Sequence, residues 1–487
     1  MFIGDLLVAH GLVSAEDVAA ALDHQRTQGG RLGDVLIAMG KLQPEALQAV
    51  LQSAPAEPTS IAETGIALPD LLNLILKAAY TGGLETASAI SDVVKLSARV
   101  VQLVLEQAQE RKLVEVLGAA GIRVNSEFRY ALTEKGKHWT LDAISQNQYV
   151  GPTPVPLAAY AERIHRQRIT NERVDRAAVD RAFTGLAITQ NFVQQIGPAI
   201  NSGRSILLYG PPGNGKTTVA ERIGNVFKDL VYIPYCFEVE GQIIKVFDPG
   251  IHRAFQQKPG QPLKGAAVRR EDFDSRWVPC RRPFIVAGGE LTLEMLDLSF
   301  NALAKFYEAP LHVKALGGIF MIDDFGRQIV SPEALLNRWI VPLERRVDYL
   351  KLHTGKSFSI PFDELVVFST NLSPQDLMDP AFLRRIPYKL EIGAPTPVQY
   401  HQIFAGLART LGITMSDQAI EFVIASLRDK AHMPLASYQP KFILDQICAA
   451  CKFAGVAPQF HPDLLRMALE NLSVNEEGEA PPARKVA

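Results

Sequence analysis

The stretch that most constrains the fold lies near the middle of the chain, where residues 205–218 read SILLYGPPGNGKTT. Five residues typical of a buried strand run directly into a loop with the spacing GxxxxGK[ST], and the VAERIGNVF that follows has helical spacing. Glycines at 210, 213 and 215 let backbone N–H groups turn inward around a polyphosphate, where a Cβ would collide. The sequence therefore predicts a strand, a phosphate-binding loop and a helix, in that order.

The motif also assigns roles to its residues. Lys216 would reach the β- and γ-phosphates of a nucleotide, and the Thr217 hydroxyl would ligate Mg²⁺. A helix that begins near Lys216 adds unpaired N–H groups and the positive end of its dipole. We therefore expect ATP and Mg²⁺ as ligands, held by Gly210, Pro211, Pro212, Gly213, Asn214, Gly215, Lys216, Thr217 and Thr218.

Carboxylates and an amide follow two further strands. GIFMIDD over 318–324 is an apolar strand that ends in Asp323 and Asp324, and LVVFST over 365–370 ends at Asn371. A strand that delivers acid beside the phosphate loop suits a Mg²⁺ ligand, the role expected for Asp323. Asp324 would orient the attacking water, and Asn371 would place a polar amide between the Asp323 strand and the phosphate.

Two adjacent arginines, Arg384 and Arg385, follow a predicted helix in DPAFLRRIPYKLEI. We expect them to act across a subunit boundary, where an arginine from a neighbour would complete the charge around the transferred phosphate. A surface salt bridge is the alternative role, more readily for one of the two than for both.

Composition sets the broad class. A length of 487 residues predicts about three domains, and 47% hydrophobic with 21% charged residues is typical of a soluble globular protein. No apolar run reaches the roughly 18 residues of a membrane span. Four cysteines and an N-terminus without a basic region before an apolar one indicate a cytoplasmic protein. A net charge of −2 gives no general attraction to nucleic acid.

Residues 1–54 contain an internal repeat: FIGDLLVAHG from Phe2 and RLGDVLIAMG from Arg31 align without a gap. Amphipathic helices are predicted after each copy, over 15–25 and 44–52. The pattern resembles the N-terminal domain of the assembly ATPases of type II secretion and type IV pili, some of which bind cyclic di-GMP. Phe2 and Ala54 stand where the ligand-binding version carries arginine and glutamine, so a structural or protein-docking module fits better than a nucleotide receptor.

A linker over 55–65 leads to a second unit, 66–150. Helices are predicted over 69–80, 84–91 and 95–109, then strands over 112–117 and 128–132, which is the order of a winged helix-turn-helix. The closing ALTEKG is similar to the wing strand of that family. Residues 66–135 carry eight basic and eight acidic side chains, so a protein-contact or regulatory wing is favoured over a DNA reader. Residues 151–181 are expected to be a connector packed on the next domain.

Residues 182 to about 471 resemble an AAA+ ATPase: GPPGNGKT its Walker A, IFMIDD its Walker B, FSTN its sensor 1 and FLRRI its arginine-finger region. The stretch from Leu335 to Asn371 is similar to the MoxR-type branch. The resemblance implies an α/β core over 182–396, with helices flanking a parallel sheet, a helical lid over 397–472 and assembly into a ring, possibly a hexamer. It departs at Asp324, where most members have glutamate, and at Lys441, where a lid arginine would contact the nucleotide.

The remaining segments are a basic loop, expected over 264–282, and a tail over 473–487 that is disordered by composition. Two classes of function follow from the whole. One is an ATP-hydrolysing machine that remodels a protein partner docked through the N-terminal domains. The alternative is a DNA-binding, transcription-linked ATPase, and a weaker one is a cyclic di-GMP-responsive ATPase of a secretion or pilus system.

Overall fold

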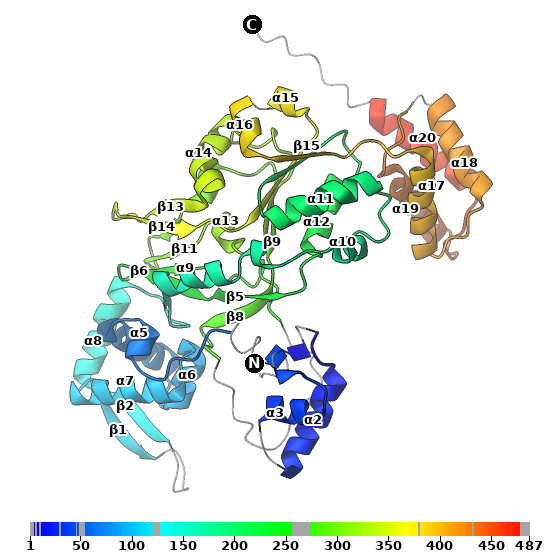
Figure 1. The fold of residues 1–487 in the computed structure, drawn as a ribbon. Helices are drawn as coiled ribbons and strands as arrows, with labels where there is room; N and C mark the ends of the chain where they lie inside the picture. The colour runs from blue at the N-terminus through cyan, green and yellow to red at the C-terminus, as the bar shows by residue number, and fades with distance from the viewer. Residues whose placement is uncertain are drawn as a thin grey trace.

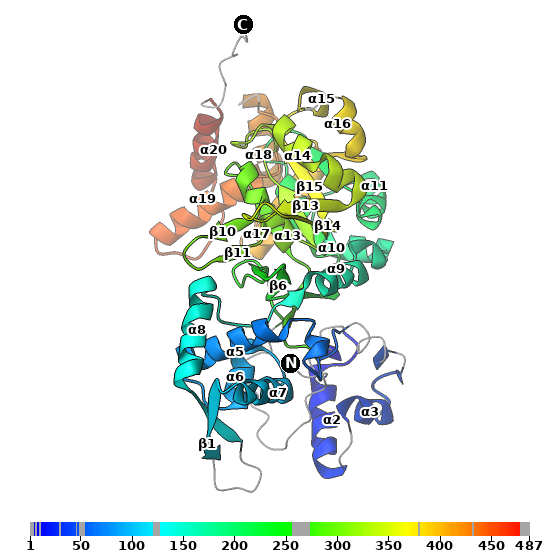
Figure 2. The same ribbon diagram turned by 90° about the vertical axis from the view of Figure 1, so that its left-hand side faces the viewer.

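The computed structural model describes residues 4, 7–8, 11–28, 31–44, 46–47, 54–119, 127–255, 273–377, 380–430 and 433–477. A large α/β core carries a helical lid on one side and two small units at its lower end (Figure 1). Turning the molecule shows these two units side by side beneath the core (Figure 2). In the described ranges, none of the helices is both long and apolar enough to cross a membrane.

A five-stranded sheet forms the centre of the core, in the order β16-β4-β15-β12-β9. Every neighbouring pair in it is parallel, and Tyr209 of β4 lies in register with Thr370 on one side and Glu391 on the other. Carboxyl ends of parallel strands share one edge of a sheet, so the segments after them converge there. The strands are β16 Tyr388–Glu391, β4 Ile206–Tyr209, β15 Leu365–Thr370, β12 Ile319–Ile322 and β9 Phe284–Ala287.

Helices cover both faces of this sheet, because its central strands are apolar on both sides. Ile206 and Leu208 pack toward one face with Val219 and Ile223, whereas Leu207 packs toward the other with Trp339. The first face is covered by α10 Arg176–Ala182, α11 Gln190–Ser202 and α12 Lys216–Gly224. The second face is covered by α13 Leu311–Lys314, α14 Pro332–Arg345 and α16 Pro380–Arg385, with α15 Pro374–Leu377 between the last two in sequence.

A second five-stranded sheet, absent from the sequence expectations, lies between the core and the N-terminal units, in the order β10-β11-β7-β6-β3. The expected connector contributes its strand β3 and helix α9 Leu157–Arg166. The strands of this sheet are β3 Val155–Pro156, β6 Cys236–Val239, β7 Gln242–Lys245, β10 Ser299–Asn301 and β11 Phe306–Glu308. Two further pairs of antiparallel strands form ribbons. One pairs β5 Leu230–Pro234 with β8 Trp277–Arg281, and the other pairs β13 Val347–Lys351 with β14 Ser357–Pro361.

The prediction of a basic loop over 264–282 is wrong for the last third of that range. Residues 277–281 form β8, and Arg276 is buried in a bidentate ion pair with Asp274. Arg276 Nη1 also donates to Thr64 O at 2.8 Å and Pro154 O at 3.3 Å. Arg282 pairs with Asp229 at 2.6 Å. These arginines join the linker and the connector to the core, while Arg269 and Arg270 lie outside the described residues.

The repeat unit contains α2 Ala15–Gln28 and α3 Leu32–Ala38. Its two copies end their first segments in the same way: Gly11 and Gly40 have φ of +67° and +68°, and the next residues donate N–H to Leu7 O and Leu36 O, each at 3.0 Å. This is the glycine-dependent C-terminal cap that the repeated spacing requires. The helix predicted over 44–52 falls largely outside the described residues.

The second unit has three helices and an antiparallel hairpin, α5 Leu68–Gly82, α6 Ala87–Val94, α7 Ala98–Glu110, β1 Val114–Ala119 and β2 Phe128–Leu132. Helices α6 and α7 start about three residues later than predicted, because Thr86 and Ser97 cap them by accepting from Ala89 N and Val100 N. The ALTEKG stretch is not a wing strand beyond Leu132. Thr133 caps a further helix, α8 Glu134–Gln146.

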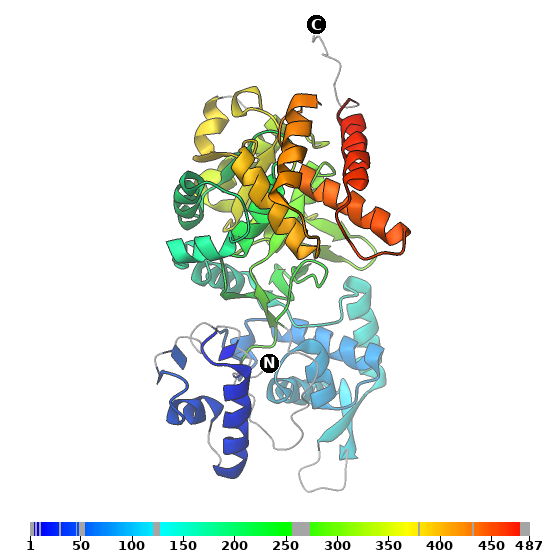
Figure 3. The same cartoon turned by 90° about the vertical axis from the view of Figure 1, so that its right-hand side faces the viewer.

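The lid packs beside the core as four α-helices around one apolar cluster (Figure 3). These are α17 Pro397–Thr410, α18 Asp417–Ala425, α19 Gln439–Phe453 and α20 Pro462–Glu477. The expectation of a disordered segment from residue 473 is wrong for 473–477, which continue α20. Residues 478–487 lie outside the described part of the chain.

Candidate functional site

The loop after β4 has the backbone that its glycines predict. Gly210, Gly213 and Gly215 have φ of +140°, +74° and +85°, values that L side chains rarely adopt. A Cβ on Gly210 would also lie 2.3 Å from Ile392 O, so the loop passes directly against the segment after β16. Helix α12 begins at Lys216, which directs its first free N–H groups into the loop. Together these features form a cradle for an anion.

Lys216 is buried, and its ammonium already has three acceptors. Nζ donates to Gly210 O and Pro211 O, each at 2.9 Å, and to Asn371 Oδ1 at 2.6 Å. Burial lowers the pKa of Lys216, and the nearby carboxylates of Asp324 and Asp323 oppose that shift. The lysine is therefore fixed across the loop mouth by groups that favour its charged form.

The two carboxylates after β12 lie near this loop on the far side of β15, the strand between β12 and β4. Thr217 Oγ1 donates to Asp323 Oδ2 at 2.9 Å, which brings a hydroxyl and a carboxylate oxygen together. Asn371 Nδ2 donates to Asp324 Oδ1 at 3.0 Å. Oxygen donors of this kind suit Mg²⁺, so Thr217 and Asp323 fit the metal expected from the sequence.

The turn that carries the carboxylates is tied to the sheet. Asp324 has φ of +50°, unusual for a residue other than glycine. Phe325 N donates to Ser369 O at 2.6 Å, and Thr370 Oγ1 donates to Phe325 O at 2.7 Å. Gln328 closes the turn, because its Nε2 donates to Asp323 O at 2.6 Å. Gln328 was not expected from the sequence, since neither its spacing nor its residue type belongs to the motif.

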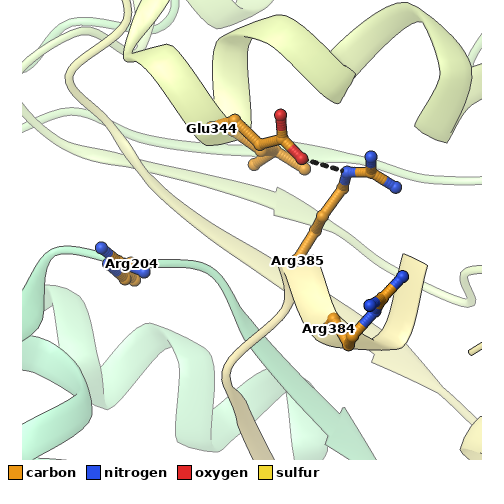
Figure 4. Close-up of a pocket in the computed structure, with 5 residues that line it drawn as sticks. Arg204, Glu344, Arg384 and Arg385 are labelled. Carbon is orange, nitrogen blue, oxygen red and sulfur yellow. Dashed lines mark hydrogen bonds and ion pairs between the residues drawn. The ribbon is translucent and has the colours of Figure 1, made fainter. Parts of the chain in front are cut away.

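Arg384 and Arg385 lie at the opposite edge of the sheet, because α16 ends just before β16 starts. They line a pocket of about 430 Å³ with Arg204, Leu343 and Glu344. In Figure 4 the Arg385 side chain reaches toward Glu344, and their Nε and Oε1 atoms lie 2.6 Å apart. Ser205 Oγ also donates to the carbonyl of Arg385 at 3.1 Å. Arg384 is exposed at the end of α16. The structure therefore does not bring either guanidinium to the phosphate loop of its own chain.

Lys441 also lies apart from the network. Its Nζ is 2.6 Å from Asp445 Oδ2, one turn further along α19, and its side chain is 68% exposed. The lid instead contacts the loop through two preceding residues that the sequence did not single out. Ser437 N donates to Asn214 Oδ1 at 3.0 Å, and a Cβ on Gly213 would lie 2.4 Å from the Tyr438 ring.

The comparisons with known proteins found one family model and several solved structures. A family model described as a domain of unknown function (DUF8689) matches residues 396–471, within the lid. Solved structures of RuvB from Thermotoga maritima are similar to the chain. A point mutant has 15% identity and a TM-score of 0.33, over 64% of this chain and 75% of that one. The structure titled as a Holliday junction branch migration motor has 17% identity and a TM-score of 0.32, over 60% and 72%. No curated protein matches the chain. Similarity this low says nothing about the activity of the chain.

Proposed function

We propose that the chain is an ATP-binding and ATP-hydrolysing protein of the AAA+ type, with a core like that of the MoxR branch. One observation carries this proposal: Lys216, Thr217, Asp323, Asp324 and Asn371, spread over 156 positions, form a single hydrogen-bonded network at one edge of a parallel sheet. A polar network of this density beside an anion cradle suits a charged ligand with a metal ion.

Each residue of the network has a chemical role in hydrolysis. Lys216 would neutralise the β- and γ-phosphates, and Thr217 and Asp323 would hold Mg²⁺, which polarises the phosphate oxygens when bound. Asp324 would orient the attacking water and accept its proton, with Asn371 fixing the carboxylate. Aspartate is one methylene shorter than glutamate, so we expect slow turnover.

The arginines at the other edge support assembly. A group needed at the phosphate but fixed at the far edge of the sheet reaches a phosphate only in a neighbouring copy. We therefore propose a homo-oligomeric ring in which Arg384 of one subunit completes the site of the next. Arg385 is the less suitable of the two, because Glu344 already pairs with it and its guanidinium lies 5.5 Å above the Phe382 ring.

We propose a protein client, docked through the N-terminal units, rather than DNA. Helix α7 is the candidate recognition helix of the winged-helix unit. It exposes Arg99 together with Glu106 and Glu110, so its solvent face is not basic. The hairpin arginine Arg129 is paired with Glu85 at 2.6 Å. Neither feature provides the positive stripe that binding to a phosphate backbone requires.

An Asp324→Asn variant tests the hydrolytic assignment. The amide keeps the shape of the side chain but cannot accept the proton of water, so we expect ATP binding within a factor of two of the parent and turnover reduced at least 100-fold. Calorimetry and phosphate release measure the two quantities. The stalled variant is also the bait for a pull-down of the client. Turnover equal to that of the parent would remove Asp324 from the mechanism.

A further inference from the structure

The two residues that precede α19, Ser437 and Tyr438, contact the phosphate loop. Asn214 is buried, with its Oδ1 accepting from Ser437 N at 3.0 Å and its Nδ2 donating to Pro211 O at 3.4 Å. Next to this bond, the ring of Tyr438 lies directly over Gly213, leaving no room for a Cβ. Thus a backbone amide and an aromatic ring of the lid contact consecutive residues of the loop.

The lid side of this contact is preorganised. Gln439 is fully buried, and its Oε1 accepts from Ala436 N at 2.9 Å while its Nε2 donates to Pro434 O at 3.0 Å. These two bonds fix the path of residues 434–438 before α19, so the N–H of Ser437 is presented to the core. A buried side chain with both ends satisfied is a rigid support.

On the core side of this contact, the position of Asn214 depends on the conformation of the phosphate loop. Asn214 stands between Gly213 and Gly215, which both have left-handed backbones. The direction of its side chain therefore follows the dihedral angles that the loop adopts. Any change in those angles when a triphosphate is seated moves the acceptor of the Ser437 N–H, and with it the start of α19.

We propose that Asn214 is a positioning residue that sets the lid according to the occupancy of the phosphate loop, with Tyr438 holding the two surfaces in register. This proposal rests on the proposed function, since it concerns regulation of the same site. Lys441, the lid residue expected from the sequence to contact the nucleotide, has no part in this contact.

Hydrogen–deuterium exchange on the full chain tests the proposal with and without ATP. In the absence of nucleotide, Asn214→Ala removes the acceptor of the Ser437 amide, so the peptide over 433–442 should exchange roughly fivefold faster, the effect expected from one lost hydrogen bond. In the parent, ATP should change exchange in this peptide, and in Asn214→Ala that response should be lost. Unchanged exchange in the variant, in both conditions, would overturn the proposal.

Two further variants separate the contact from folding. Tyr438→Ala should reproduce the faster exchange, whereas Tyr438→Phe, which keeps the ring, should restore the behaviour of the parent. Lys452→Ala, an exposed change near the other end of α19, is the matched control. If Lys441→Ala abolished the response to ATP and Asn214→Ala did not, the lysine would be the coupling residue and the proposal would be wrong.

The outcome is distinguishable from failure of the proposed function. Calorimetry on the parent reports ATP binding independently of the lid. If the parent bound no ATP, the ATPase proposal would fail, while the exchange without nucleotide would still decide whether Asn214 fastens the lid. If the parent bound ATP but exchange near Ser437 did not depend on Asn214, the ATPase proposal would stand without this coupling.

Discussion

The two edges of the central sheet differ in whether their charged side chains have partners within the chain. At the carboxyl edge, a hydrogen-bonded network within a single chain joins Lys216, Thr217, Asp323, Asp324 and Asn371. At the amino edge, Arg384 is exposed and has no ion pair with any described residue. The first edge resembles a finished binding site, and the second resembles half of one. This difference is the reason for our proposal that one subunit binds ATP by itself, whereas hydrolysis needs an arginine from a neighbouring copy.

The largest effect should come from a substitution at the carboxyl edge of the sheet. Lys216→Ala removes the cation that lies across the loop mouth and leaves Asn371 Oδ1 without its donor, so we expect ATP affinity and hydrolysis to fall at least 100-fold. Calorimetry and phosphate release measure them. Lys228→Ala, an exposed lysine just beyond α12, is the matched control. A Lys216→Ala variant that hydrolysed ATP as fast as the parent would refute the site itself.

Arg384→Ala tests whether the other edge is half of a site. We expect ATP binding to persist, because the loop is untouched, and hydrolysis to fall about 100-fold or more, as for arginines supplied in trans. The same measurement on Arg385→Ala should show a smaller loss, since that guanidinium is held by Glu344.

A mixing experiment distinguishes action in trans from a local defect. Arg384→Ala has an intact phosphate loop, and Lys216→Ala has an intact Arg384. If the arginine acts across subunits, mixed assemblies should recover activity that neither variant shows alone. No recovery, under conditions where the two variants assemble together, would place Arg384 outside the active site.

The arrangement of residues at the carboxyl edge could be predicted from the sequence, because these residues come directly after strands. Parallel strands bring their carboxyl ends together, so Asp323 and Asn371 needed only correct strand assignments to be placed beside Lys216. Contacts set by distant partners could not be predicted. Arg276 was expected in a basic loop, but its acceptors Thr64 O and Pro154 O lie 212 and 122 residues away in the chain.

Local sequence patterns are ambiguous where one residue decides between two structures. In ALTEKG, the first two residues continue strand β2, but Thr133 Oγ1 accepts from Gly136 N and caps the start of α8. Gly136 is needed there because a Cβ would lie 1.9 Å from Leu113 O. In the lid, Lys441 pairs with Asp445 one turn further along α19. Ser437 and Tyr438 contact the phosphate loop instead.

The two edges also differ in how they hold a buried ionisable group. Carboxylates support the charged form of Lys216, whereas Glu364, just before β15, is fully buried and neither of its carboxyl oxygens has a hydrogen-bond partner among the described residues. Burial raises the pKa of Glu364 well above its usual value, with Asp363 and Asp348 adding to the shift and Arg346 opposing it. His312 and Arg338 pair with Asp348 nearby.

The smallest predicted effect follows from the sign of that shift. A carboxyl whose pKa is higher in the folded state contributes its full stability below the pKa of the unfolded chain, and this is lost as the pH rises through the folded value. Glu364→Gln stays neutral, so its melting temperature should exceed that of the parent at pH 8 by a few degrees, about 1 kcal/mol, and the gap should close toward pH 5. Glu333→Gln, at an exposed position of α14, should show no such trend. Parallel pH profiles for Glu364→Gln and the parent would mean that Glu364 is ionised in the folded protein, and the contrast between the two edges would then be one of pairing alone.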